Sequence, residues 1–124
     1  MLFVCYTKCT TCHKAQTFLD ARGVKYVFRD IRSDNPTEAE IRDWHIKSGL
    51  PLRRFFNTSG LQYKALGLSA KLSSMSEAEQ YRLLASDGML VKRPILVLGD
   101  QVLIGFRQPE WEVLLPSSGA AAAK

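Results

Sequence analysis

Apolar and polar residues recur along the chain with two different periods, and the order of these periods predicts the fold. An apolar run from Leu2 to Tyr6 is short and rich in β-forming residues, which is typical of a buried central strand. The next segment repeats apolar residues every three or four positions and ends near Arg22, as an amphipathic helix does. A second strand is predicted between Val24 and Ile31, and a β-α-β connection makes it parallel to the first.

The middle of the chain carries helix-start signals instead of strand patterns. Thr37 and Ser76 each stand three residues before a glutamate, which is the capping-box pattern of a helix N-terminus. Between these two helices, short apolar clusters separated by Gly60 and Gly67 predict small helical turns. We therefore expect a helical insertion within a single domain, because no linker is long enough to separate a second one.

Two strands and a helix are predicted to follow the insertion. Ile95–Leu98 and Gln101–Gly105 flank Gly99-Asp100, which is a two-residue hairpin loop. A last helix is predicted over Glu110–Leu115, with Pro109 suited to its first turn. The order β-α-β, helices, then β-β-α predicts an α/β domain of the thioredoxin-like type with a helical insertion in its middle.

Composition adds bounds to this prediction. The 124 residues, 46% hydrophobic and 23% charged, suit one globular domain. We expect it to span residues 1–116, followed at 117–124 by a small, polar, disordered tail, natural or left by cloning. No apolar run is long enough for a membrane span and no signal-peptide layout is present, so a cytoplasmic protein without membrane contact is predicted. The net charge of +5 is spread over scattered bases, which argues against direct nucleic-acid binding.

Candidate chemistry concentrates at residues 7–14, Thr-Lys-Cys-Thr-Thr-Cys-His-Lys, where the first strand gives way to the first helix. The free N–H groups and the positive dipole end of a helix start favour an anion, so we expect Cys9 to be a reactive thiolate. Cys12 stands three residues later, shares a helix face with Cys9 and is within reach to resolve a mixed disulfide on it. A Cys-x-x-Cys pair beside a β-α-β pattern is typical of thioredoxin-like redox proteins.

Other interpretations of the cysteines remain open at this point. A structural zinc site needs four ligands, usually from two spaced pairs, and Cys5 and His13 are the only nearby extra ligands. Inert buried thiols are a further alternative. Cys5 lies inside the predicted first strand, where a small core residue is favoured over a catalytic one. Three cysteines in a chain that lacks secretion signals suggest a reducing compartment, where a disulfide is transient and functional.

A proline stands directly before the third predicted strand. The bond between Arg93 and Pro94 can be cis, and its bend can bring backbone polar groups toward a substrate on the thiols. We therefore expect a cis Pro94 beside the loop that carries Cys9. The alternative is a trans proline that starts a strand.

These features together resemble the arsenate reductase (ArsC-type) family and its Spx-like regulators. The resemblance runs from residue 2 to about 115 and is carried by Cys-Thr-Thr-Cys at a helix start, Arg93-Pro94, and Gly105-Phe106-Arg107 before the last helix. In the glutaredoxin-coupled arsenate reductases, the first cysteine attacks the oxyanion and arginines hold it. The resemblance therefore implies that Cys9 is the nucleophile and that Arg93 and Arg107 bind the substrate.

Two departures from the family pattern affect the expected activity. Reductases with one active-site cysteine lack a second cysteine at the position of Cys12. The family's arginine in the middle region is replaced by Asn57, whereas Arg53 or Arg54 takes that place only with poorer agreement. The chain therefore resembles an uncharacterised branch of the family, and we expect it to reduce arsenate poorly.

The sequence predicts a cytosolic thiol-disulfide oxidoreductase or ArsC-like reductase without a bound cofactor or metal. Cys9 attacks a small-molecule or disulfide substrate, Cys12 closes a Cys9–Cys12 disulfide, and glutathione or a redoxin (glutaredoxin or thioredoxin) restores the thiols. Substrate contacts are expected from Arg93, Arg107, Asn57 and Pro94. The alternative is an Spx-like redox-sensing regulator that docks on RNA polymerase and uses the same cysteine pair as a switch.

Overall fold

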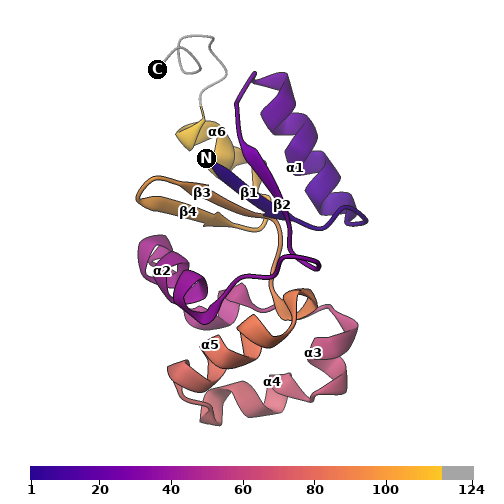
Figure 1. Ribbon diagram of the computed structural model, residues 1–124, viewed down its shortest axis with the longest axis vertical. Helices are drawn as coiled ribbons and strands as arrows, with labels where there is room; N and C mark the ends of the chain where they lie inside the picture. The colour runs from indigo at the N-terminus through magenta and orange to yellow at the C-terminus, as the bar shows by residue number, and fades with distance from the viewer. Residues whose placement is uncertain (116–124) are drawn as a thin grey trace.

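The computed structural model describes residues 1–115, and a four-stranded sheet lies at the centre of this part of the chain (Figure 1). The strands follow the order β2-β1-β3-β4. Strand β1 (Leu2–Cys5) pairs in parallel with β2 (Val27–Asp30), whereas β3 (Ile95–Leu98) runs antiparallel to both β1 and β4 (Gln101–Ile104). This topology confirms the predicted thioredoxin-like α/β fold. The predicted domain end at residue 116 and the tail at 117–124 lie outside the described residues.

Helices cover both faces of the sheet. The α-helices of the described chain are α1 (Thr10–Ala21), α2 (Glu38–Ser48), α3 (Leu61–Ala65), α4 (Leu68–Lys71), α5 (Glu77–Ser86) and α6 (Gln108–Leu114). Short 3-10 helices span Leu52–Phe55, Leu72–Ser74 and Gly88–Leu90. Figure 1 shows α1 and α6 on one side of the sheet and α2 on the other, with α3, α4 and α5 beyond it.

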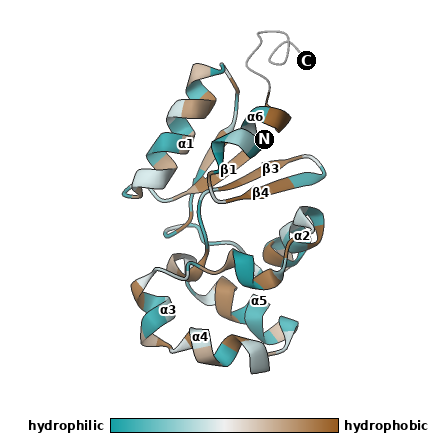
Figure 2. Ribbon diagram, turned by 180° about the vertical axis from the view of Figure 1, so that it is seen from behind, coloured by the Kyte–Doolittle hydropathy of each residue, from teal (hydrophilic) through white to brown (hydrophobic). Residues whose placement is uncertain are grey.

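The sheet separates two hydrophobic clusters. Successive strand residues point to opposite faces, so Phe3 and Cys5 face α1 and α6, whereas Val4 faces α2 and α5. Figure 2 shows hydrophobic colour along the strands, while the helices alternate between hydrophobic and hydrophilic stretches. The strands β1 and β3 at the centre of the sheet are therefore covered on both sides, whereas the edge strand β2 is partly exposed, and the helices are amphipathic. No helix among residues 1–115 is long and apolar enough to cross a membrane.

Both predicted capping boxes are confirmed. The Thr37 hydroxyl accepts a hydrogen bond from the Glu40 N–H at 3.1 Å, and the Glu40 carboxylate accepts one from the Thr37 N–H at 2.9 Å. Ser76 and Glu79 form the same reciprocal pair at the start of α5. These caps set the beginnings of α2 and α5, the helices that pack in the cluster on the Val4 side of the sheet.

The two ends of the helical insertion are joined by backbone hydrogen bonds. The Asn57 N–H donates to the Leu90 carbonyl at 2.8 Å, and the Lys92 N–H donates to the Phe55 carbonyl at 2.7 Å. The chain therefore leaves the sheet unit and returns to it at one place, directly before the Arg93–Pro94 bond.

The second strand is shorter than predicted. It spans Val27–Asp30 rather than Val24–Ile31. The Val24 N–H donates to the Leu19 carbonyl at 3.2 Å, so this residue closes the C-terminus of α1 instead of pairing with β1. The last helix begins earlier than predicted, at Gln108, with Pro109 in its first turn.

Candidate active site around Cys9

Cys9 occupies the N-cap position of α1, directly before the first helical residue. Its N–H donates to the Tyr6 carbonyl at 3.0 Å, and its carbonyl accepts from the His13 N–H at 3.1 Å. Its side chain is a free, half-buried thiol that makes no capping hydrogen bond. The unpaired N–H groups of the first turn therefore remain available to a negative charge on the sulfur or on a ligand beside it.

A cavity of about 510 Å³ lies over Cys9. It forms where the start of α1, the segment before β3 and the two ends of the insertion meet. Its lining residues are Cys9, Thr11, Asn57, Ser59, Gly60, Leu61, Gln62, Met89, Lys92 and Arg93. Cys9, Asn57 and Arg93, three of the residues singled out from the sequence, are thus brought together.

Arg93 has guanidinium donors that nothing in the described chain satisfies. Its Nε and Nη1 atoms are buried and make no hydrogen bond to residues 1–115. The guanidinium carbon lies 5.3 Å from the centroid of the Tyr6 ring, which supports the planar group from one side. Buried unpaired donors are costly, and a guanidinium fork suits a carboxylate or another oxyanion. Arg93 also lines the Cys9 cavity, so its positive charge favours an anion there.

The peptide bond between Arg93 and Pro94 is cis, as the sequence predicted. Pro94 is buried, and its carbonyl accepts a hydrogen bond from the Gly105 N–H at 2.8 Å. Gly105 has a φ of 73°, a conformation that glycine adopts most readily. Pro94 is not among the residues that line the Cys9 cavity, which Arg93 borders directly.

The cysteine pairing differs from the prediction. Cys12 is joined to Cys5, with their Cα atoms 5.8 Å apart, instead of to Cys9. The reason is the direction of the side chains. Cys12 shares the buried face of α1 with Ala15, and Cys5 points from β1 toward the same cluster. The prediction that Cys5 is buried in the core is confirmed, but Cys5 is a disulfide partner rather than a lone thiol.

The strand period and the helix period of the sequence already indicated that Cys5 and Cys12 are core residues. Positions 3 and 5 fall on the same face of a strand, and positions 12, 15 and 19 fall on the same face of a helix. Both cysteines therefore stood at core positions, whereas Cys9 did not.

Comparison with known proteins identifies the family. The ArsC family matches residues 5–114. The chain belongs to the ArsC family.

Several proteins resemble the chain over most of its length. It is 45% identical over 112 residues to the uncharacterized protein YusI of Bacillus subtilis, covering 90% of this chain and 95% of YusI. A solved ArsC-family-related protein from Bacteroides fragilis is 50% identical with a TM-score of 0.89, covering 91% of this chain and 95% of that one. A structure described as a possible arsenate reductase from Streptococcus mutans is 47% identical with a TM-score of 0.81, covering 86% and 91%. The regulator Spx 2 of Bacillus cereus is more distant, 24% identical over 119 residues, which are 94% of this chain and 89% of Spx 2.

The two remaining residues that the ArsC resemblance singled out lie in different surroundings. Asn57 lines the Cys9 cavity, and its amide donates to the Met89 carbonyl at 3.5 Å. Arg107 is the N-cap of α6, does not line the cavity and forms a 3.3 Å ion pair with Glu110. Its side chain is 65% exposed. A substrate contact through Arg107 stays a prediction.

Lys92 is a second cation in the lining of the Cys9 cavity, and it was not predicted from the sequence. It precedes the Arg93–Pro94 bond and lines both the Cys9 cavity and a larger one next to it. Its signal was its place directly before the two residues that the resemblance singled out.

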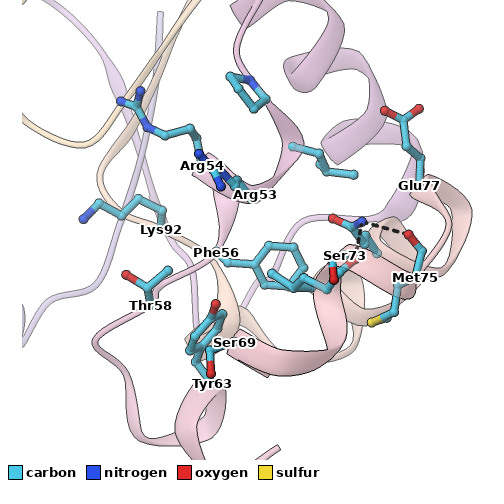
Figure 3. Close-up of a pocket in the computed structure, with 14 residues that line it drawn as sticks. Arg53, Arg54, Phe56, Thr58, Tyr63, Ser69, Ser73, Met75, Glu77 and Lys92 are labelled. Carbon is cyan, nitrogen blue, oxygen red and sulfur yellow. Dashed lines mark hydrogen bonds between the residues drawn. The ribbon is translucent and has the colours of Figure 1, made fainter. Parts of the chain in front are cut away.

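The larger cavity has a volume of about 700 Å³ (Figure 3). Arg53, Arg54 and Lys92 gather on one side of it, and Glu77 is the single acidic residue of its lining, on the opposite side (Figure 3). Its apolar lining comes from Leu52, Phe56, Leu72 and Met75. The two arginines that the sequence offered as replacements for Asn57 therefore line this cavity instead of the one over Cys9.

No group of three or more His, Cys, Asp or Glu side chains within residues 1–115 is arranged to hold a metal ion.

Proposed function

We propose that this ArsC-family chain is a thiol-disulfide oxidoreductase in which Cys9 is the nucleophile. One observation carries the proposal: a free, half-buried thiol at a helix N-terminus shares a cavity with the cation Arg93. A thiolate needs positive potential beside it to be populated, and a disulfide substrate needs access to it. The cavity offers both.

The first step is the attack of the Cys9 thiolate on one sulfur of a disulfide. A bond forms between Cys9 and that sulfur, the S–S bond of the substrate breaks, and the other half leaves as a thiolate. Arg93, Lys92 and the first-turn N–H groups of α1 favour the negative charge as it moves between the sulfurs. Cys12, once the Cys5–Cys12 disulfide is reduced, or an external thiol such as glutathione or a redoxin, resolves the mixed disulfide.

A disulfide suits this cavity better than arsenate does. An arsenate dianion gives up its hydration on entry and needs charged donors in return. Arg93 and Lys92 are the cations that line the Cys9 cavity, Asn57 contributes a neutral amide, and Arg107 is engaged by Glu110 outside it. We therefore propose that arsenate reduction is a weak activity of this protein.

The neighbouring cavity supports a substrate larger than an oxyanion. It shares Lys92 with the Cys9 cavity and combines an apolar lining with Arg53 and Arg54. A disulfide held at Cys9 with an acidic, partly apolar organic group would extend into it. Glutathione and redoxins keep thiols reduced in the cytoplasm, so we propose that the protein acts there.

Coupled turnover is the test. The reduction of arsenate and the reduction of a glutathione mixed disulfide are each measured with glutathione and glutaredoxin as electron donors, and Cys9→Ser serves as the blank. The rate of the same mixture without the protein is subtracted, because glutathione and glutaredoxin reduce mixed disulfides by themselves. Above that rate we expect measurable disulfide reduction, weak arsenate reduction and neither activity in Cys9→Ser. Disulfide reduction that survives the Cys9→Ser substitution contradicts the proposal.

A second function is favoured by the similarity to Spx. If the chain is a redox-sensing regulator, the same thiols act as a switch and no substrate is turned over. Retention of RNA polymerase on the immobilised protein, together with the absence of turnover in the assay above, would favour this function over the enzyme.

A further inference from the structure

We propose that Cys5 is a third redox-active residue, and that the three cysteines form a relay that returns Cys9 to the free thiol after each reaction. This proposal rests on the proposed role of Cys9. It is carried by the arrangement of the cysteines: Cys9 is a free thiol at a cavity, whereas Cys5 and Cys12 form a disulfide behind it.

Burial divides the three sulfurs into one accessible group and one enclosed pair. Cys5 is 0% exposed and Cys12 is 2% exposed, within a cluster that includes Leu19 and Trp111. A disulfide substrate or an external thiol therefore meets Cys9 first. Cys12 also lines a smaller cavity of about 230 Å³ with Tyr6 and His13, but it is only 2% exposed, so Cys9 is the more accessible entry for electrons.

Cys12 stands between the other two cysteines in the fold. It is joined to Cys5 in the structure, and its three-residue separation from Cys9 makes the two neighbours across the helix start. The Tyr6 N–H donates to the Cys12 sulfur at 3.3 Å, and such a bond favours negative charge on that sulfur. Cys12 can therefore act as the nucleophile toward Cys9 and as the partner of Cys5.

The relay starts from three thiols and has three exchange steps. The Cys9 thiolate attacks the substrate disulfide, forms a mixed disulfide and releases the first substrate thiolate. The Cys12 thiolate then attacks the Cys9 sulfur, forms Cys9–Cys12 and releases the second substrate thiolate. Finally the Cys5 thiolate attacks the Cys12 sulfur, which forms Cys5–Cys12 and releases the Cys9 thiolate.

The sum of these steps balances. The substrate disulfide gains two electrons and two protons and becomes two thiols, while the Cys5 and Cys12 dithiol loses them and becomes the disulfide seen in the structure. The helix N-terminus favours Cys9 as the leaving thiolate of the last step. Two equivalents of an external thiol, such as glutathione, reverse the path through Cys9 and are oxidised to their disulfide.

Disulfide mapping tests the relay. The full chain is reduced, freed of reductant without oxygen, treated with oxidised glutathione, quenched in acid, alkylated and mapped by peptide mass spectrometry. We expect Cys5–Cys12 as the joined pair in the unmodified protein, with Cys9 alkylated or carrying a glutathionyl group. In Cys5→Ser and in Cys5→Ala, the product shifts to Cys9–Cys12.

Reduction of the oxidised protein by glutathione provides a second readout that needs no substrate turnover. We expect Cys5–Cys12 to be reduced in the folded unmodified protein and to be reduced much more slowly in Cys9→Ser, because an external thiol then meets only the 2% exposed Cys12. Equal reduction in both proteins overturns the relay.

The mapping also separates failure of the relay from failure of the proposed function. If the unmodified protein ends as Cys9–Cys12 with Cys5 alkylated, the relay is wrong and Cys9 remains the nucleophile. If Cys9 is never modified and Cys9→Ser consumes oxidised glutathione as fast as the unmodified protein, the role of Cys9 itself is wrong and the relay fails with it.

Discussion

The sheet unit (residues 1–50 and 91–115) and the helical insertion (residues 51–90) contribute different things to the site. The sheet unit supplies Cys9, Arg93 and the cis Pro94, held by strand pairing across the whole sheet and by α1. The insertion supplies the facing wall, including Asn57, from short helices and turns. The reactive groups are therefore on the most constrained part of the molecule, and the substrate-facing surface is on the least regular part.

This difference separates chemistry from recognition. A nucleophile has to be oriented accurately, which a helix start anchored on a sheet achieves. The wall contains neutral and polar side chains, such as Asn57, Ser59 and Gln62, that tolerate exchange without disturbing the strands. Relatives with the same sheet unit can thus differ in substrate through the insertion.

The two regions meet in the hydrophobic cluster that contains Val4 and Leu84, whereas the cluster that contains Trp111 belongs to the sheet unit alone. The two largest predicted effects, one in each cluster, test whether the regions unfold together. Trp111 is fully buried against Phe3 and Phe106, with its indole N–H donated to the Gly105 carbonyl at 3.1 Å. Trp111→Ala removes these contacts, and we expect a loss of about 3–5 kcal/mol of stability. Denaturant unfolding measures it, and Val113→Ala on the exposed face of α6 is the control.

The matching change in the insertion is Leu84→Ala. Leu84 is fully buried in the cluster that α5 shares with α2 and the sheet, and we expect a loss of about 2–5 kcal/mol. In both variants fluorescence and circular dichroism should follow one transition. A separate early transition in Leu84→Ala would show that the insertion unfolds independently of the sheet unit.

A substitution in the insertion tests whether this region sets the substrate preference. Asn57→Arg adds a charged donor to the wall of the Cys9 cavity, and a charge-assisted hydrogen bond to arsenate is worth about 1.5–3 kcal/mol. We expect arsenate turnover to rise about ten- to a hundredfold. Thr58→Arg adds the same charge to the neighbouring cavity and serves as the control. An equal rise in both variants would mean that net charge, and not the Cys9 cavity, limits arsenate turnover.

The smallest effect concerns the ion pair that ties α2 to β2 within the sheet unit. Arg29 donates to the Glu40 carboxylate at 2.6 and 2.9 Å, and this hydrogen bonding is the main cause that lowers the pKa of Glu40 below its ordinary value of 4.5. Since Glu40 is partly exposed, Glu40→Gln should cost only about 1 kcal/mol near neutral pH.

The pH dependence of this pair has a definite sign. A carboxyl group with a lowered pKa in the folded state stabilises the protein above its ordinary pKa and loses that contribution as the pH falls through the lowered value. The difference in unfolding free energy between the unmodified protein and Glu40→Gln should therefore be full at pH 6 and shrink below about pH 4. Glu38→Gln, on the same helix but with a weaker 3.9 Å pairing to Arg82, is the control and should show a smaller difference. A difference that grows on acidification would contradict this assignment.

Much of the sheet unit could be predicted because its signals are local. The apolar run before Cys9, the capping box at Thr37 and the hairpin loop at Gly99 each act over a few residues and lead to one backbone conformation. The cis Pro94 was predicted from its place before the third strand and is confirmed.

The rest depended on distances that a linear sequence does not contain. The Cys9 and Cys12 spacing suggested a pair. The strand and helix periods put Cys5 and Cys12 at core positions, but only the structure shows that these positions lie against each other. Arg107 followed from the resemblance alone, whereas its actual environment is set by its ion pair with Glu110 and by the direction in which α6 starts. The place of Lys92 directly before Arg93 hinted at a role, but only the structure shows that two cavities meet at its side chain.

The backbone hydrogen bonds between the two ends of the insertion allow the insertion to be replaced as a unit. Hydrogen bonds from Asn57 to Leu90 and from Lys92 to Phe55 join the first and last residues of the insertion. The insertion therefore starts and ends at the same place on the sheet unit. A longer, shorter or different insertion changes the surface that faces Cys9, while the strands keep their register. Selection, or an engineer who transplants an insertion from a relative, can thus change the substrate preference while the residues around Cys9 on the sheet unit stay the same.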